Sequence, residues 1–129
     1  MMIDKEARYL ESHEWAKKQE KDIFTVGLTA YAIEQLGDIV YMELPEAGTE
    51  VTAGEPFGVV ESVKSASDLY VPISGTVVEV NTDVPDNPDI LKSDAYDAGW
   101  LIKVRASDSD AFEGLMDHAA YKKFLETEA

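Results

Sequence analysis

Lys64 is the residue of this sequence whose surroundings most clearly suggest chemistry. It lies in VVESVKSASD (59–68), and no other lysine or arginine occurs between Lys21 and Lys92, an interval with thirteen acidic residues. Such an amine is either a solvated surface lysine or the target of an enzyme that acylates it. Isolation favours the second interpretation, because an enzyme that docks there finds no competing amine nearby.

The neighbours of Lys64 argue against a catalytic role for its amine. Val63 and Ser65 are small and offer little to hold the side chain, so we expect it to project into solvent. Carboxylates such as Glu61 and Asp68 favour the charged ammonium, whereas a Schiff-base or general-base lysine acts as the neutral amine.

The composition excludes several other kinds of chemistry. The chain has 129 residues, is 45% hydrophobic and carries a net charge of −15, which makes nucleic acids and anionic membranes poor partners. It has no cysteine, so any redox chemistry must be brought by a cofactor. His13 and His118 are far apart in sequence and are best interpreted as surface or interface residues, which disfavours a zinc site or an autonomous hydrolase.

Short strands separated by turns dominate the predicted secondary structure. Runs rich in β-branched and aromatic residues, bounded by glycine, proline and other turn-forming residues, predict strands. They lie within 13–20, 22–28, 38–45, 58–64, 69–80 and 100–104. The segment 29–37 predicts a short helix with Thr29 as N-cap and Gly37 after its end. One helical turn is expected near Ile90 and Leu91, and a helical segment at about 109–127 should cover one side of the sheets. Residues 1–129 are expected to form a single domain, with Lys64 on a hairpin.

The N-terminus, MMIDKEARYL, has neither the apolar core of a signal peptide nor the character of a transit peptide. We therefore expect a cytoplasmic protein, or a mitochondrial-matrix protein if a transit peptide has been removed.

Six segments, in order and spacing, resemble the H protein family of the glycine cleavage system. They are SHEW (12–15), VGLT (26–29), LGDIVYMELPEAG (36–48), ESVKSASD (61–68), VPISGTVVEVN (71–81) and GWLIKV (99–104). The resemblance runs from about Tyr9 to about Leu125. It implies a lipoyl-domain-like barrel-sandwich hybrid of two small antiparallel sheets, mainly β, with a C-terminal helix and with lipoate attached covalently to Lys64.

The resemblance also implies a function as a monomeric carrier and not an enzyme. The carrier would move the aminomethyl group of glycine from a pyridoxal-phosphate glycine decarboxylase (P protein) to a tetrahydrofolate-dependent aminomethyltransferase (T protein). A dihydrolipoyl dehydrogenase (L protein) would then reoxidise the dithiol, and a lipoate-attaching enzyme would load Lys64. No nucleic acid, membrane or metal is implied.

The cationic amine of the loaded arm needs a carboxylate in a partly closed cleft. Glu14 and Asp68 are the candidate carboxylates, and Ser12 is a candidate hydrogen-bonding neighbour. The alternative for Glu14 is a solvated strand residue, since exposed carboxylates are common.

Three other kinds of carrier share some of these features. A biotin carrier usually places methionine on both sides of its lysine, whereas Val63 and Ser65 stand here. Lipoyl domains of 2-oxoacid dehydrogenases typically sit on mobile linkers beside a catalytic domain. A lipoate relay or regulatory carrier without glycine flux stays open, because Ala30 and Ile33 replace an acid and a glutamine that are common in the family.

Overall fold

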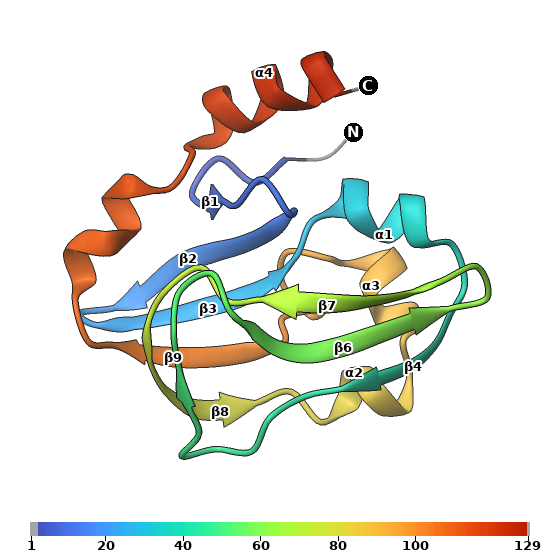
Figure 1. The fold of residues 1–129 in the computed structure, drawn as a ribbon, viewed down its shortest axis with the longest axis horizontal. Coiled ribbons are helices and arrows are strands. Elements are labelled where there is room, and N and C mark those ends of the chain that lie inside the picture. The colour runs from blue at the N-terminus through green and yellow to red at the C-terminus, as the bar shows by residue number, and fades with distance from the viewer. Residues whose placement is uncertain (1–2, 129) are drawn as a thin grey trace.

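Residues 3–128 of the protein are described in a computed structural model (Figure 1). Within these residues, a six-stranded sheet has the order β1-β2-β3-β9-β8-β5 and a three-stranded sheet has the order β4-β6-β7. Neighbouring strands are antiparallel throughout. The prediction of a mainly β fold with two antiparallel sheets is therefore confirmed.

The elements have the following bounds. The larger sheet contains β1 (Arg8–Tyr9), β2 (Glu14–Glu20), β3 (Ile23–Leu28), β5 (Glu50–Val51), β8 (Gly75–Val80) and β9 (Ile102–Ala106). The smaller sheet contains β4 (Ile39–Glu43), β6 (Pro56–Ser62) and β7 (Ala66–Tyr70). The helices are α1 (Ala30–Leu36), α2 (Asp83–Asp86), α3 (Asp89–Ser93), the 3₁₀ helix η1 (Ser109–Gly114) and α4 (His118–Glu128).

Both sheets contribute to one hydrophobic core. Val26 of β3 and Val104 of β9 are almost fully buried, as are Val60 of β6 and Leu69 of β7. Successive side chains of a strand point to opposite faces, so each sheet turns one apolar face toward this shared core. The run 69–80, predicted as one strand, instead divides around Pro72 and carries the chain from the smaller sheet to the larger one.

Helix α1 forms as its local sequence predicts. The Thr29 hydroxyl accepts a hydrogen bond from the Ala32 amide at 3.2 Å. At the other end Gly37 has a φ of 76° and donates its amide to the Ile33 carbonyl. A side-chain N-cap and a glycine in the left-handed region satisfy groups that a short helix leaves unpaired.

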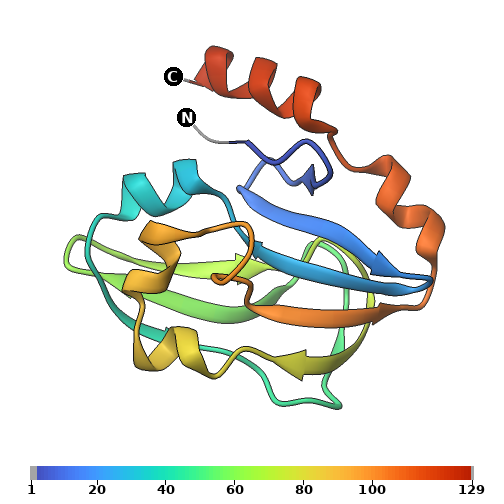
Figure 2. The ribbon, with the colours of Figure 1, turned by 180° about the vertical axis from the view of Figure 1, so that it is seen from behind.

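The segment 81–99 contains two short helices. The helical turn predicted near Ile90 and Leu91 is α3, whereas α2 was not expected. Helix α3 buries Leu91 and packs against α1 (Figure 2). Within residues 3–128, no helix is both long and apolar enough to span a membrane.

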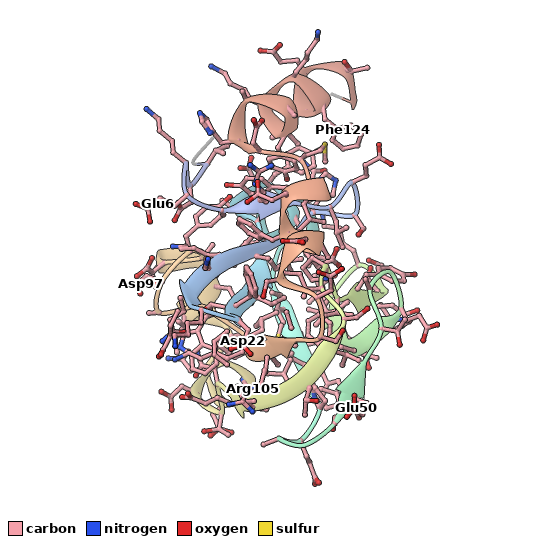
Figure 3. All side chains as sticks on the ribbon, turned by 90° about the vertical axis from the view of Figure 1, so that its left-hand side faces the viewer. Glu6, Asp22, Glu50, Asp97, Arg105 and Phe124 are labelled. Atoms are coloured by element: carbon pink, nitrogen blue, oxygen red, sulfur yellow. The ribbon has the colours of Figure 1, made fainter. Side chains whose placement is uncertain are left out.

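The C-terminal segment is divided by a contact with β1. Tyr9 and Met116 exchange two backbone hydrogen bonds of 2.8 and 3.1 Å, and this pairing separates η1 from α4. The Tyr121 ring of α4 stacks on that of Tyr9 with 4.3 Å between centroids. Helix α4 therefore packs over the β1 edge of the larger sheet and not over a sheet face, as the position of Phe124 in Figure 3 shows.

Gly27 is expected to be sensitive to substitution, because the Trp15 ring of the paired strand lies on its backbone. A Cβ at Gly27 would lie 2.4 Å from Trp15 Cζ2, and Trp15 is fully buried. Overpacking of this kind costs about 1–3 kcal/mol. Gly27→Ala should lower the free energy of unfolding by that amount in urea denaturation. Gly114→Ala is the matched control, since its Cβ would meet nothing within 4 Å, and equal stability of the two variants would contradict the assignment.

Candidate functional site

The turn between β6 and β7 presents Lys64 at its tip. The Ser62 amide donates to the Ser65 carbonyl at 2.8 Å, so Val63 and Lys64 form the turn itself. The hydroxyl of the buried Ser62 accepts hydrogen bonds from the amides of Lys64 and Ser65, both at 3.2 Å. One serine thus holds the backbone on both sides of the lysine side chain. The hairpin that the sequence predicts around Lys64 is present.

The expectation that nothing holds the Lys64 side chain is wrong. Its Nζ donates a hydrogen bond of 3.3 Å to the carbonyl of Gln35, in the last turn of α1. Its Cε lies 3.4 Å from where a Cβ of Gly37 would be. The carbonyls at a helix C-terminus lack partners and carry partial negative charge, which attracts a cation. The exposed lysine therefore lies along the end of α1.

A cleft of about 350 Å³ opens on one side of α1. It is lined by Ser12, His13, Glu14, Leu28, Tyr31, Ala32, Gln35, Leu36, Val60, Ser67, Asp68 and Leu69. Three candidates from separate parts of the sequence, Ser12, Glu14 and Asp68, are thus brought to one cleft. Lys64 does not line the cleft, but it contacts Gln35, which does.

Glu14 is buried in this cleft wall and is not a solvated strand residue. Its side chain accepts hydrogen bonds from the Ser12 hydroxyl at 2.5 Å and from the Tyr70 amide at 3.0 Å. Burial raises the pKa of Glu14 to about 7, although the hydrogen bonds from Ser12 and Tyr70 favour the ionised form and oppose this shift. The carboxyl is therefore poised between its neutral and ionised forms near neutral pH.

Asp68 differs from Glu14 in its surroundings. It is exposed on β7, which is an edge strand of the smaller sheet. Its cross-strand partner is Val59, whereas Val60, the buried cleft residue, faces Ser67. Asp68 thus belongs to the rim of the cleft and Glu14 to its wall. Of the two candidate carboxylates, Glu14 is the one withdrawn from water.

The turn before β2 explains the position of Glu14. His13 has a φ of 79°, an uncommon conformation for a residue other than glycine. The Leu10 amide donates to the Glu14 carbonyl and the His13 amide to the Leu10 carbonyl, at 2.9 and 3.0 Å. The Thr29 amide donates to the His13 carbonyl, which fixes the turn to the start of α1. These bonds direct the Glu14 side chain toward β7.

His13 and Tyr31 are cleft residues that sequence reasoning missed. Their rings lie 4.8 Å apart between centroids, and His13 Nδ1 lies 2.8 Å from the Tyr121 hydroxyl. The Tyr121 hydroxyl also donates to the Thr29 hydroxyl at 2.9 Å. Helix α4 is thereby connected to the cleft. The adjacency of His13 to Glu14 in SHEW was the only sequence feature that pointed to it.

The arrangement combines an attachment point with a nearby receptor for a cation. A group attached to Lys64 begins at the end of α1, beside a cleft whose wall holds the buried Glu14 carboxyl. A cationic amine that entered this cleft would favour ionised Glu14, because opposite charges stabilise one another most where water is excluded.

Comparison with known proteins identifies the family. The family model for glycine cleavage H-protein matches residues 7–128. Curated glycine cleavage system H proteins from Rhodopirellula baltica and Escherichia coli O7:K1 are similar to the chain. The first is 56% identical over 90% of this chain and 89% of the relative, and the second is 45% identical over 98% of each.

A solved structure supports the same grouping. The crystal structure of a glycine cleavage system H protein from Mycobacterium marinum has a TM-score of 0.84 and 37% identity to this chain, with 98% of each chain covered. On the matched family model, these relatives and this shared fold, the chain belongs to the glycine cleavage H-protein family.

Proposed function

We propose that this protein is the lipoyl carrier of a glycine cleavage system. The observation that carries the proposal is the placement of Lys64, an isolated amine on a rigid hairpin tip beside the cleft that Glu14 lines. An acylated lysine at such a tip is accessible to several enzymes in turn. Membership of the H-protein family supports the same role.

The residues around Lys64 fit a lipoyl amide. The lysine is exposed, and the end of its side chain lies beside Gly37 at the C-terminus of α1. Acylation removes the charge but keeps one N–H, so the contact with the Gln35 carbonyl can persist as a neutral hydrogen bond. Lipoate, when bound, supplies the disulfide and dithiol that this cysteine-free chain lacks.

Three enzymes would use the protein in succession. A pyridoxal-phosphate glycine decarboxylase would deliver an aminomethyl group, a tetrahydrofolate-dependent aminomethyltransferase would remove the carbon unit and release ammonia, and a dihydrolipoyl dehydrogenase would restore the disulfide. The acidic surface suits exchangeable docking of partners with basic faces. The protein itself acts as a carrier and is not an enzyme.

Within the chain, the cleft protects the aminomethyl cargo between enzymes. The cationic amine of the cargo would pair with Glu14, whose carboxylate is held in place by the hydroxyl of Ser12 and the backbone amide of Tyr70. Asp68 at the rim adds negative charge at the entrance. Because Glu14 is buried, an amine paired with it would be shielded from bulk water, which would otherwise release the cargo by hydrolysis.

Reconstitution tests the proposal. Lipoylated protein mixed with the three enzymes, glycine, tetrahydrofolate and NAD should support release of ammonia from glycine, and unlipoylated protein should not. If the lipoylated protein supports no release while an established H protein does in the same mixture, the role of lipoate relay without glycine flux is favoured. The reason for keeping this alternative is that Ala30 and Ile33 of α1 stand where the family commonly has an acid and a glutamine.

A further inference from the structure

Three exposed hydrophobic side chains lie near the tip of the Lys64 hairpin. Among the described side chains, the large hydrophobic residues classed as exposed are Val40, Tyr41 and Val63, with exposed fractions of 62%, 47% and 68%. Val63 immediately precedes Lys64, and the other two lie on β4, the strand paired with β6. Scattered exposed apolar residues need no explanation, but a cluster beside a modification site does.

The local structure creates this cluster. The pairing of β4 with β6 shifts register between Ile39 and Tyr41, which leaves Val40 as an extra residue in a bulge. The Val63 amide donates to the Asp38 carbonyl at 3.0 Å and so joins the hairpin tip to the start of β4. Bulges are common where a strand must redirect a side chain. Here the bulge leaves two successive side chains exposed beside Val63.

Carboxylates border the cluster. Glu61 lies across from Tyr41 in the strand register, and the Tyr41 hydroxyl donates to Glu43 at 3.0 Å. Lys64 is the nearest cation in sequence, and its charge is lost on acylation. A partner that covers these residues therefore needs an apolar centre with Lys or Arg around it.

We propose that Val40, Tyr41 and Val63, with Glu43 and Glu61 at their edge, form the docking surface for the enzyme that acylates Lys64. We call these five residues the acylation surface. The inference rests on the proposed function, because it requires that Lys64 be lipoylated. It goes further by assigning the partner contact to residues outside the cleft.

The chemistry of acylation selects this occupant. The neutral Lys64 amine attacks the carbonyl of an activated lipoyl ester, the C–N bond forms, and the acyl–oxygen bond breaks. The leaving group departs with the electron pair, and a base takes the amine proton. The activated ester must therefore reach Nζ itself, next to Val63. Enzymes that act on the far end of a lipoyl arm do not share this constraint.

Kinetics of acylation test the assignment. The double variant Val40→Thr with Val63→Thr keeps side-chain shape and β-branching at two exposed sites while removing apolar surface. With a lipoate–protein ligase, lipoate and ATP, its kcat/KM should fall about tenfold, mainly through KM. Glu43→Gln with Glu61→Gln should lower the rate less and reduce its dependence on salt. Val51→Thr makes the same chemical change at a partly buried valine on β5 of the larger sheet, so the folded variant should be acylated at the wild-type rate.

Two further measurements separate the possible outcomes. Acylation of Lys64 by an activated lipoyl ester without enzyme should be unchanged in the valine double variant, which shows that the amine is equally reactive. Fully lipoylated variant should accept aminomethyl groups from glycine decarboxylase with unchanged KM. Equal ligase kinetics for variant and wild type, or a defect confined to the decarboxylase, would overturn the assignment. Failure of the wild type to be lipoylated at all would instead count against the proposed function.

Discussion

Lys64→Arg is expected to abolish attachment of lipoate completely. Arginine keeps the positive charge and can still donate to the Gln35 carbonyl, but its guanidinium is not acylated under conditions that modify an amine. After incubation with a lipoate ligase, lipoate and ATP, wild-type protein should gain the mass of one lipoyl group, and the variant should gain none. The expected effect is total loss, and folding should be unchanged because the side chain is exposed.

Lys92→Arg is the matched control for this prediction. Lys92 is also exposed, and its Nζ forms an ion pair with Asp38 at 2.5 Å. Arginine can preserve that pair, so this variant should be lipoylated like wild type. A lipoyl group found on Lys64→Arg would show that another amine is the acceptor.

Glu14→Gln is expected to change both stability and the lifetime of the cargo. In the unfolded chain the pKa of Glu14 lies near its ordinary value of 4.5, and burial raises it to about 7 in the folded protein. Between pH 4.5 and 7 the unfolded state loses a proton that the folded state retains, so the free energy of unfolding falls as pH rises through this window. Each pKa unit corresponds to about 1.4 kcal/mol, which gives a total of about 3 kcal/mol.

The glutamine variant lacks this contribution to the pH dependence. Its amide oxygen can accept from the Tyr70 amide, and its NH₂ can donate to the Ser12 hydroxyl, so the two contacts persist. Urea denaturation at pH 8 should show the variant more stable than wild type by about 1–3 kcal/mol, with little difference at pH 4. Glu34→Gln, an exposed carboxylate on α1, is the control and should show neither effect. Identical pH profiles for wild type and Glu14→Gln would contradict a buried, titrating Glu14.

Glu14→Gln is expected to stabilise the protein but to shorten the lifetime of the aminomethyl cargo. A hydrogen bond to a charged group contributes about 1.5–3 kcal/mol, and a neutral amide cannot pair with the cationic amine. The aminomethyl group on isolated lipoylated variant should therefore hydrolyse about tenfold faster than on wild type. A carboxyl that is buried for its function lowers the stability of the protein. Its replacement should therefore give a more stable protein that protects the cargo less well. An unchanged lifetime would remove Glu14 from the proposed role.

Local patterns in the sequence predicted the parts of the fold that local interactions determine. The Thr29 cap and Gly37 end of α1 depend on residues within one helical turn, and both were correctly predicted. The hairpin under Lys64 likewise follows from two β-rich runs joined by small polar residues. The break between η1 and α4 was missed, because it depends on Met116 pairing with Tyr9, a residue at the other end of the chain.

In the candidate site, too, the residues could be predicted from local sequence, but the contacts between distant segments could not. Lys64 could be singled out by charge alone, and Ser12, Glu14 and Asp68 were named from residue type and family resemblance. Their common cleft could not be predicted, since it depends on how α1 and β7 pack beside the turn at His13. The burial of Glu14 and the contact between Lys64 and Gln35, 29 residues apart, are tertiary effects of the same kind.

The most direct test of the carrier proposal is the mass of Lys64 after a single turnover. Lipoylated protein is incubated with glycine decarboxylase and glycine labelled at its methylene carbon, without tetrahydrofolate, and the peptide that contains residues 59–68 is sequenced by mass spectrometry. The proposed function predicts a labelled aminomethyl group on the lipoyl arm of Lys64, dependent on glycine and on the decarboxylase. Lipoylated peptide that gains no label, with decarboxylase that loads an established H protein, would contradict it.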